Sequence, residues 1–150
     1  MLHVMFQVGG ADYVLPAADV AQMETFQGAT QVPGAPAHVA GVVQLRGHVL
    51  PVLDVRARFG LPRDGRSPEA RIIVVEREGR RVALLVDRAR EVIDLRPEEF
   101  RDPPELVSSQ AAGFVQAIAQ RAERVLMLVD LERVLGNDLS PREDRHGQET

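Results

Sequence analysis

The sequence predicts a mostly β protein that consists of two small β-barrels packed together, with a few short helices. Three observations carry this prediction: many short apolar or alternating stretches, turn residues between them, and an internal repeat. The chain of 150 residues is long enough for one ordinary domain. It contains no cysteine, which excludes a disulfide framework and a thiolate metal site.

Most of the strands are expected to form hairpins. The expected pairs are His3–Val8 with Asp12–Leu15 around Gly9-Gly10, Val39–Leu45 with His48–Val55 around Arg46-Gly47, and Arg71–Arg77 with Arg80–Asp87 around Glu78-Gly79. Further strands are expected at Arg90–Leu95, Ala112–Ala119 and Arg124–Val129. Pro51 cannot donate a backbone hydrogen bond, so we expect an edge strand or a bulge at that residue.

Only short helices are expected, at Val55–Phe59, Leu131–Leu135 and Ala17–Thr25. The first two end at Gly60 and Gly136, because glycine is the usual residue after a helix. Asp54 and Asp130 precede these two helices. A carboxylate there accepts backbone N–H groups, so we interpret both as helix caps and not as a catalytic pair. Residues 137–150 are rich in charge and are expected to form a flexible tail.

An internal repeat relates the two halves of the chain. His48–Gly60 aligns with Arg124–Gly136, Gly41–Gln44 aligns with Gly113–Gln116, and the hairpin around Gly10 matches the one around Gly79. The repeat predicts a single domain over residues 1–136 with internal halves at about 1–62 and 70–136. Whether the halves exchange strands is left open. Halves of this size form weak cores alone, so they should pack against each other.

Composition excludes several classes of function. The net charge of −4 and the aromatic content of 4% disfavour a nucleic-acid partner, which needs a basic surface and stacking rings. The chain lacks a long apolar run and a signal-peptide pattern, so a cytoplasmic protein without membrane insertion is expected. Its four histidines lack metal-ligand spacing and its serines lie in no nucleophile elbow. We therefore expect no metal, no cofactor and no enzymatic activity.

One stretch is unusually poor in charge. Arg46 is the only formal charge between Thr25 and Leu53. The stretch is either a core-forming segment or an apolar surface that a partner covers, and the residues alone favour neither. For Arg46 the two interpretations are contact with a partner and a salt bridge to an acid such as Asp54.

Residues 32–60, with Leu45-Arg46-Gly47 at their centre and Asp54-Val55-Arg56 and Phe59-Gly60 at their end, resemble the core signature of the CheW family of chemotaxis coupling proteins. Glu91-Val92-Ile93, Pro103-Pro104 and Val129-Asp130-Leu131-Glu132-Arg133 are similar to later elements of that family. The resemblance covers about residues 4–136.

The resemblance implies two SH3-like, five-stranded β-barrel subdomains and a non-enzymatic adaptor. Such proteins couple the cytoplasmic hairpin tips of chemoreceptors to the regulatory domain of a CheA-type histidine kinase in a signalling array. Because each half has too little core to be stable alone, we also expect a monomer in which both subdomains unfold together. An alternative is a divergent paralogue that keeps only one of the two interfaces and serves as a modulator or spacer in a motility, pilus or developmental pathway.

By the same resemblance, two sets of residues are candidates for partner contacts. The receptor-binding set comprises Val20, Gln22, Met23, Val42, Arg46 and Gly47, and the kinase-binding set comprises Gly41, Glu105 and Leu106. For Leu106 the alternative is an ordinary loop residue that anchors its loop on the barrel. Family members commonly have Val-x-Glu at the position of Val20-Ala21-Gln22, so the missing carboxylate at Gln22 is a departure from the family pattern.

Overall fold

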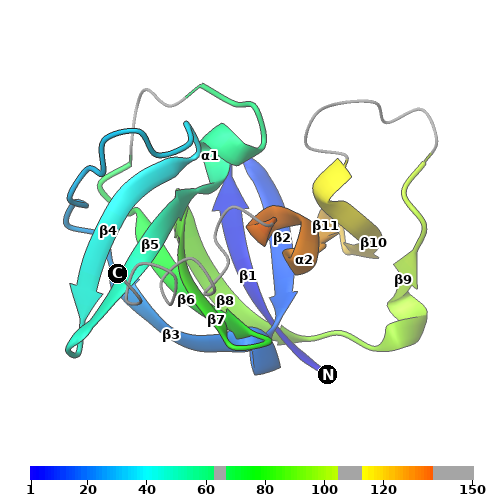
Figure 1. The fold of residues 1–150 in the computed structure, drawn as a ribbon. Coiled ribbons are helices and arrows are strands. Elements are labelled where there is room, and N and C mark those ends of the chain that lie inside the picture. Colours follow the sequence, from blue (N-terminus) through cyan, green and yellow to red (C-terminus); the bar gives the residue numbers. More distant parts are fainter. Residues whose placement is uncertain (63–66, 105–112, 137–150) are drawn as a thin grey trace.

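The computed structural model describes residues 1–62, 67–104 and 113–136, which form two β-sheets and a few short helices (Figure 1). One sheet has the strand order β3-β6-β7-β5-β4. Its strands are β3 (Val20–Thr25), β4 (Val39–Leu45), β5 (His48–Asp54), β6 (Arg71–Arg77) and β7 (Arg80–Val86). We call this sheet and the core inside it the first barrel.

The other sheet has the order β8-β1-β2-β11-β10-β9 and forms the second barrel. Its strands are β1 (Leu2–Val8), β2 (Ala11–Pro16), β8 (Arg88–Asp94), β9 (Phe100–Arg101), β10 (Val115–Arg121) and β11 (Arg124–Val129). The sixth strand, β9, has only two residues. The prediction of a mostly β protein with two small barrels is confirmed.

Each barrel combines strands from both halves of the sequence. The β1–β2 hairpin lies in the second barrel, where β2 pairs in parallel with β11 and β1 pairs with β8. The β6–β7 hairpin lies in the first barrel, where β7 pairs in parallel with β5 and β6 pairs with β3. Neither 1–62 nor 70–136 therefore forms a sheet by itself, because the two halves exchange their first hairpins.

The pairing registers repeat between the barrels, with one offset for the exchanged hairpins and another for the hairpins β4–β5 and β10–β11. His3 lies opposite Pro16 and Ile93, and Ile72 lies opposite Leu85 and Glu24. The hairpins β4–β5 and β10–β11 carry irregularities at corresponding places, between Val39 and Gly41 and between Val115 and Ala117. The predicted repeat is thus visible in the hydrogen-bonding pattern, but the alignment of Gly41–Gln44 with Gly113–Gln116 is wrong, because the registers match Gly41 with Ala117.

Short helices follow β5 and β11. They are α1 (Val55–Arg58) and α2 (Leu131–Leu135), with two 3₁₀ turns at Ala17–Asp19 (η1) and Pro97–Glu99 (η2). The Asp54 carboxylate accepts from the N–H groups of Arg56 and Ala57, and the Asp130 carboxylate accepts from the N–H of Arg133. The capping roles of both aspartates are confirmed. No helix in the described ranges is long and apolar enough to cross a bilayer.

The predicted helix at Ala17–Thr25 is wrong. Only η1 is helical there, and β3 follows it. Partly buried Val20, Gln22 and Glu24 alternate with exposed residues, and this period of two suits a strand paired with β6. The local composition favours a helix, but the edge of β6 offers backbone N–H and C=O groups that only a neighbouring strand can pair with.

Pro51 also differs from expectation, because β5 is an interior strand between β7 and β4. Pairing between β5 and β7 begins at Val52, so the missing N–H of Pro51 lies just outside that parallel ladder. The irregularity of this hairpin falls on β4, between Val39 and Gly41.

Three apolar clusters form the core. The largest contains buried residues of both sheets, among them Phe6, Tyr13, Phe59, Leu84 and Leu135. One smaller cluster fills the first barrel and another fills the second. Because the largest cluster joins the barrels, most of the hydrophobic stabilisation depends on both being folded.

Candidate functional site

Arg46 lies at the tip of the β4–β5 hairpin, which projects from the lower left of the first barrel in Figure 1. Arg46 and Gly47 have φ values of +51° and +83°, so both lie in the left-handed region that a type I′ turn requires. Asparagine and glycine are the common residues at the first of these positions. Glu78 and Ala122 hold the same left-handed conformation in other hairpins, so the turn accepts a side chain here and lets that of Arg46 project.

The guanidinium of Arg46 is exposed, and it forms no ion pair with a described residue. The expected alternative, a salt bridge to Asp54, is wrong within the described structure. Asp54 is buried, and its carboxylate caps α1. Within the described ranges, Arg46 is thus an exposed cation without an acidic partner.

A hollow of about 280 Å³ brings Arg46 together with Gln22 of β3. We call it the Arg46 hollow, and its lining comprises Gln22, Leu45, Arg46, His48, Leu50, Val74 and Arg81. Arg81 forms an ion pair with Glu76, which does not line the hollow, and its Nη2 lies 3.4 Å from Oε1 of Glu76. Two guanidinium groups and no carboxylate line the hollow, so it favours an anionic group from a partner.

Gln22 stands on the face of β3 that points toward this hollow, because it pairs with Val74. Its amide donates to Glu24 Oε2 over 3.3 Å. The carboxylate that is missing at position 22 is thus present two residues further along the same face of the strand. The departure from the family pattern moves the negative charge without removing it from β3.

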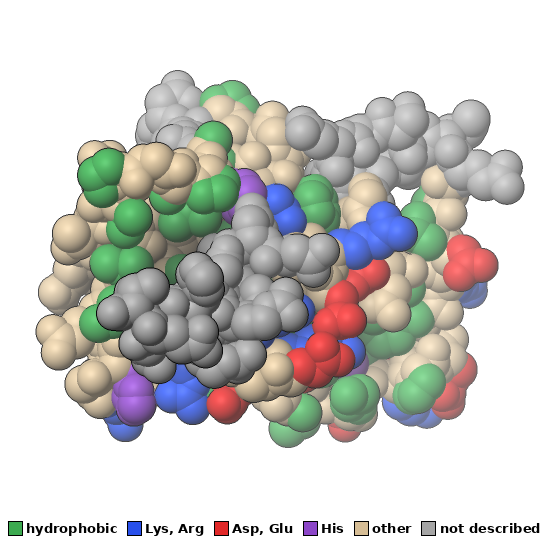
Figure 2. Space-filling model, in the orientation of Figure 1, with side chains coloured by type: hydrophobic (Ala, Val, Ile, Leu, Met, Phe, Trp, Pro, Cys, Tyr) green, Lys and Arg blue, Asp and Glu red, His purple; other side chains and the backbone are tan. Residues whose placement is uncertain are grey.

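A larger groove of about 690 Å³ adjoins the Arg46 hollow and shares Leu45 with it. This β4 groove runs between residues 25–30 and the hairpin β4–β5, and it includes Val42 and the 65% exposed Val49. Apolar side chains gather over this side of the molecule in Figure 2, while charged side chains dominate the lower and right-hand parts of that view. The charge-poor segment Thr25–Leu53 therefore supplies both a core layer and an apolar surface.

Val20 and Met23 do not line the Arg46 hollow or the β4 groove. Val20 packs against the core cluster between the barrels, and Met23 pairs with Ile73, whose side chain belongs to that same cluster. Met23 is 43% exposed. The structure thus places Met23 on the opposite face of β3 from Gln22, and the apolar side chains that line the hollow with Arg46 are Leu45, Leu50 and Val74.

Among the predicted kinase-binding residues, Gly41 is buried in β4. A Cβ at this position would lie 2.2 Å from the carbonyl oxygen of Thr30, and φ is +145°. Thr30 and Val42 exchange backbone hydrogen bonds of 2.8 and 2.9 Å across this contact. Gly41 is therefore explained by the close approach of two chain segments. Glu105 and Leu106 lie outside the described residues.

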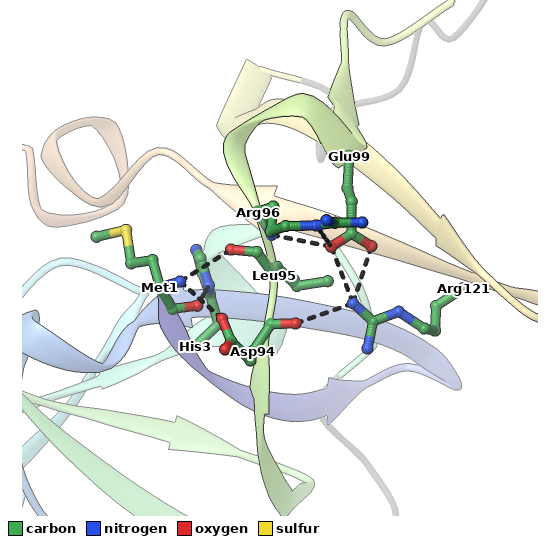
Figure 3. Close-up of polar contacts among 7 residues, drawn as sticks. All are labelled: Met1, His3, Asp94, Leu95, Arg96, Glu99 and Arg121. Atoms are coloured by element: carbon green, nitrogen blue, oxygen red, sulfur yellow. Dashed lines mark hydrogen bonds and ion pairs between the residues drawn. The ribbon is translucent and has the colours of Figure 1, made fainter.

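The acidic groups with shifted pKa values lie in the second barrel, away from Arg46 (Figure 3). Glu99 accepts from the backbone N–H of Arg96 at 2.9 Å and from Arg121 at 2.8 Å, and these bonds lower the pKa of its carboxyl. The N-terminal ammonium group lies 2.7 Å from Asp94 and lowers the pKa of that carboxyl. No cluster of metal-ligating side chains occurs in the part of the chain that the structure describes.

Comparison with known proteins identifies the family. The CheW-like domain model matches residues 2–138. The chain is 33% identical over 137 residues to the chemotaxis protein CheW of Bacillus subtilis (strain 168), a match that covers 91% of this chain and 88% of that protein. It is 30% identical over 135 residues to the chemotaxis protein CheW of Rhizobium meliloti (strain 1021), covering 90% and 87% of the two chains.

A solved structure agrees with this result. The crystal structure of the scaffolding protein TtCheW from Thermoanaerobacter tengcongensis superimposes with a TM-score of 0.81 at 30% sequence identity, covering 89% of this chain and 91% of that one. Sequence and fold therefore match over nearly the same extent. The chain belongs to the family of CheW-like domains.

Proposed function

We propose that this protein is a non-enzymatic adaptor of a chemosensory pathway, which couples a chemoreceptor to a CheA-type histidine kinase in the cytoplasm. The match to the CheW-like domain over residues 2–138 is the observation that carries the proposal. The matches to the relatives named as chemotaxis proteins extend over most of the length of those proteins. The related solved structure is described as that of a scaffolding protein.

The receptor contact is assigned to the first barrel, on the Arg46 hollow and the adjoining β4 groove. The hollow offers the guanidinium groups of Arg46 and Arg81, and the groove offers Val42 and Val49 beside it. A helical receptor tip with an acidic side chain next to apolar ones matches this pairing of charge and apolar surface. Gly47 contributes the turn that lets Arg46 project.

Replacement of Arg46 by alanine tests the receptor contact. The repeat has Ala122 at the corresponding turn, with φ of +56°, so this kind of turn accepts alanine. Arg46→Ala should lower receptor affinity by the ~2–5 kcal/mol typical of a truncated interfacial charge. Ala122→Arg, in the second barrel, should leave receptor affinity unchanged. Isothermal titration with a receptor fragment measures both, and equal affinity of wild type and Arg46→Ala at equal melting temperature would contradict the assignment.

The kinase contact remains a proposal that rests on the family resemblance. It involves Glu105 and Leu106 directly, whereas buried Gly41 contributes by fixing the path of β4. Separate titrations with the kinase regulatory domain and with the receptor fragment distinguish the adaptor from the alternative paralogue. An adaptor binds both partners. The carboxylate lies at Glu24 and not at position 22, so the titration with the receptor fragment should come first. A paralogue that has lost the receptor interface would bind the kinase domain alone.

A further inference from the structure

The end of the second barrel contains a cavity of about 330 Å³, which we call the end cavity. Leu95, Phe100, Leu128 and Leu131 supply most of its apolar wall. The mouth of a small β-barrel is a common place for a small-molecule site, and such sites combine apolar walls with a few polar groups. The polar residues of its lining are His3, Asp19, Arg77 and Gln116, and of these only His3 is buried.

His3 is buried, with 3% of its surface exposed, and it lines the end cavity. Its Nδ1 lies 3.1 Å from the carbonyl oxygen of Met1, as Figure 3 shows. A carbonyl only accepts, so Nδ1 carries the proton of this bond, and in the neutral ring Nε2 is an acceptor. Among the described residues, Nε2 has no hydrogen-bond partner.

The repeat shows that the fold does not need an imidazole at this position. The residue equivalent to His3 in the first barrel is Ile72, which has the same strand partners in the repeat. Ile72 lines the β4 groove, and Phe26 beside it corresponds to Leu95: the N–H of Phe26 donates to Ala70 as that of Leu95 donates to Met1. Nε2 of His3 is not among the buried atoms that lack a partner, so it keeps accessible surface, and the isoleucine of the equivalent position shows that packing does not require an imidazole here.

The charged groups around the cavity suit an acidic ligand. Arg77 and Asp19 line it, and Arg77 Nη1 lies 3.5 Å from Asp19 Oδ2. The buried Nε of Arg77 has no hydrogen-bond acceptor among the described residues, since Glu132 Oε1 is 3.6 Å away. Asp19 and Glu132 therefore flank the guanidinium, and the group that it leaves for an acidic ligand is the unused N–H donor at Nε.

We propose that the end cavity binds a small carboxylic acid with a ring or a short branched apolar chain. The carboxyl group meets Nε2 of His3 and shares its proton with it, which forms a carboxylate–imidazolium pair on the side of Arg77. The apolar part lies against Leu95 and Leu128. A cavity of about 150 Å³ holds benzene, so 330 Å³ accommodates a six-membered ring with a carboxyl group. This site is separate from the proposed receptor contact in the first barrel.

Benzoate is the probe that tests this site, and toluene is its counterpart without an acidic group. The full-length protein is titrated with each, and binding is followed in nuclear magnetic resonance spectra of the ¹⁵N-labelled histidine rings. Benzoate should shift the ring signals of His3 in a saturable way and bind at least tenfold more tightly than toluene. His3→Ile, the residue of the equivalent barrel position, should weaken benzoate binding at least tenfold. His48→Ile, in an exposed turn of the first barrel, should leave it unchanged.

A second variant covers the case in which His3→Ile does not fold. Leu128→Phe narrows the cavity while it keeps His3, so it should also weaken benzoate binding. The proposal is overturned if the His3 signals do not saturate, if toluene binds as tightly as benzoate, or if both His3→Ile and Leu128→Phe bind benzoate like the wild type.

Discussion

Gly41 and Gly113 align in the sequence repeat but differ in their surroundings, and the strand registers make Ala117 the structural equivalent of Gly41. A Cβ at Gly41 would meet the Thr30 carbonyl oxygen at 2.2 Å in a left-handed backbone, whereas a Cβ at Gly113 meets nothing within 4 Å. Gly41→Ala should therefore lower the free energy of unfolding by about 2–4 kcal/mol through strain and overpacking. Gly113→Ala should change it by less than about 0.5 kcal/mol. Urea denaturation measures both, and similar effects of the two variants would refute this explanation of Gly41.

Glu99 links stability to pH at the residue scale. Its pKa is lowered in the folded protein, chiefly by the backbone N–H of Arg96 and then by Arg121. A carboxyl with a lowered folded pKa stabilises the protein above its unfolded pKa and loses this contribution as pH falls through the folded value. Glu99→Gln should therefore reduce the loss of melting temperature between roughly pH 5 and pH 3. Glu98→Gln, on the same turn, is the control. A wild-type pH profile in Glu99→Gln would show that these hydrogen bonds do not contribute.

At the scale of elements, ion pairs connect the exchanged hairpins to the helices. The helix supplies the basic residue in one of these contacts and the acidic residue in the other. Asp87 accepts from the N–H of Gly9 at 2.8 Å and from Arg56 Nε of α1 at 2.9 Å. In the repeat, the residue equivalent to Arg56 is Glu132 of α2, which lies 3.6 Å from both Arg77 and Arg80 of the other exchanged hairpin. Both contacts link the two barrels: Asp87 connects the turn of β1–β2 to α1, and Glu132 connects α2 to the β6–β7 hairpin.

The Asp87 contact should contribute measurably to stability. Asp87 and Arg56 are 20% and 23% exposed, so solvent screens this pair only partly. Asp87→Ala should lower the free energy of unfolding by about 2–3 kcal/mol, because it removes two hydrogen bonds to a charged group. Glu76→Ala breaks the exposed pair with Arg81 and should lower it by less than about 1 kcal/mol. Equal midpoints of the two variants in urea would contradict the proposed link.

The elements that the sequence predicted correctly are those that local residues determine. The hairpins around Gly9-Gly10, Arg46-Gly47 and Glu78-Gly79 follow from their turn residues, and α1 and α2 follow from an aspartate before and a glycine after a short apolar run. The exchange of hairpins could not be predicted, because the parallel pairing of β2 with β11 joins strands more than a hundred residues apart. Nothing in the local sequence of a hairpin determines whether it pairs with β5 or with the equivalent strand β11.

In the candidate site, too, the features set by local sequence were predicted and those set by strand pairing were not. The charge-poor segment and its turn pointed to Arg46 as an exposed cation, and the structure places it so. Val20 and Met23 were placed with Gln22 in the receptor-binding set by family resemblance alone, which does not say which face of the segment each side chain occupies. In a strand, alternation separates Met23 from Gln22, and the latter alone reaches the hollow. The importance of His3 became visible only when the register of the repeat paired it with Ile72.

At the scale of the whole molecule, the exchange of hairpins predicts a single unfolding transition. Each barrel needs strands from both halves of the chain, and the largest apolar cluster contains residues of both sheets. Neither barrel can therefore unfold while the other keeps its complete set of strands. Calorimetric and van't Hoff enthalpies of unfolding should agree, as they do for a two-state domain.

The fluorescence of Tyr13 tests this prediction at a single position, because Tyr13 is the only tyrosine and the chain has no tryptophan. Its ring lies in the second barrel, within the cluster between the sheets. Ile72→Ala removes buried side-chain volume inside the first barrel and should cost about 2–5 kcal/mol. If the barrels unfold together, this variant lowers the melting temperature reported by Tyr13 fluorescence as much as that reported by circular dichroism. An unchanged Tyr13 midpoint beside a lowered circular dichroism midpoint would show that the second barrel is stable alone, and the hairpin exchange would then not couple the two.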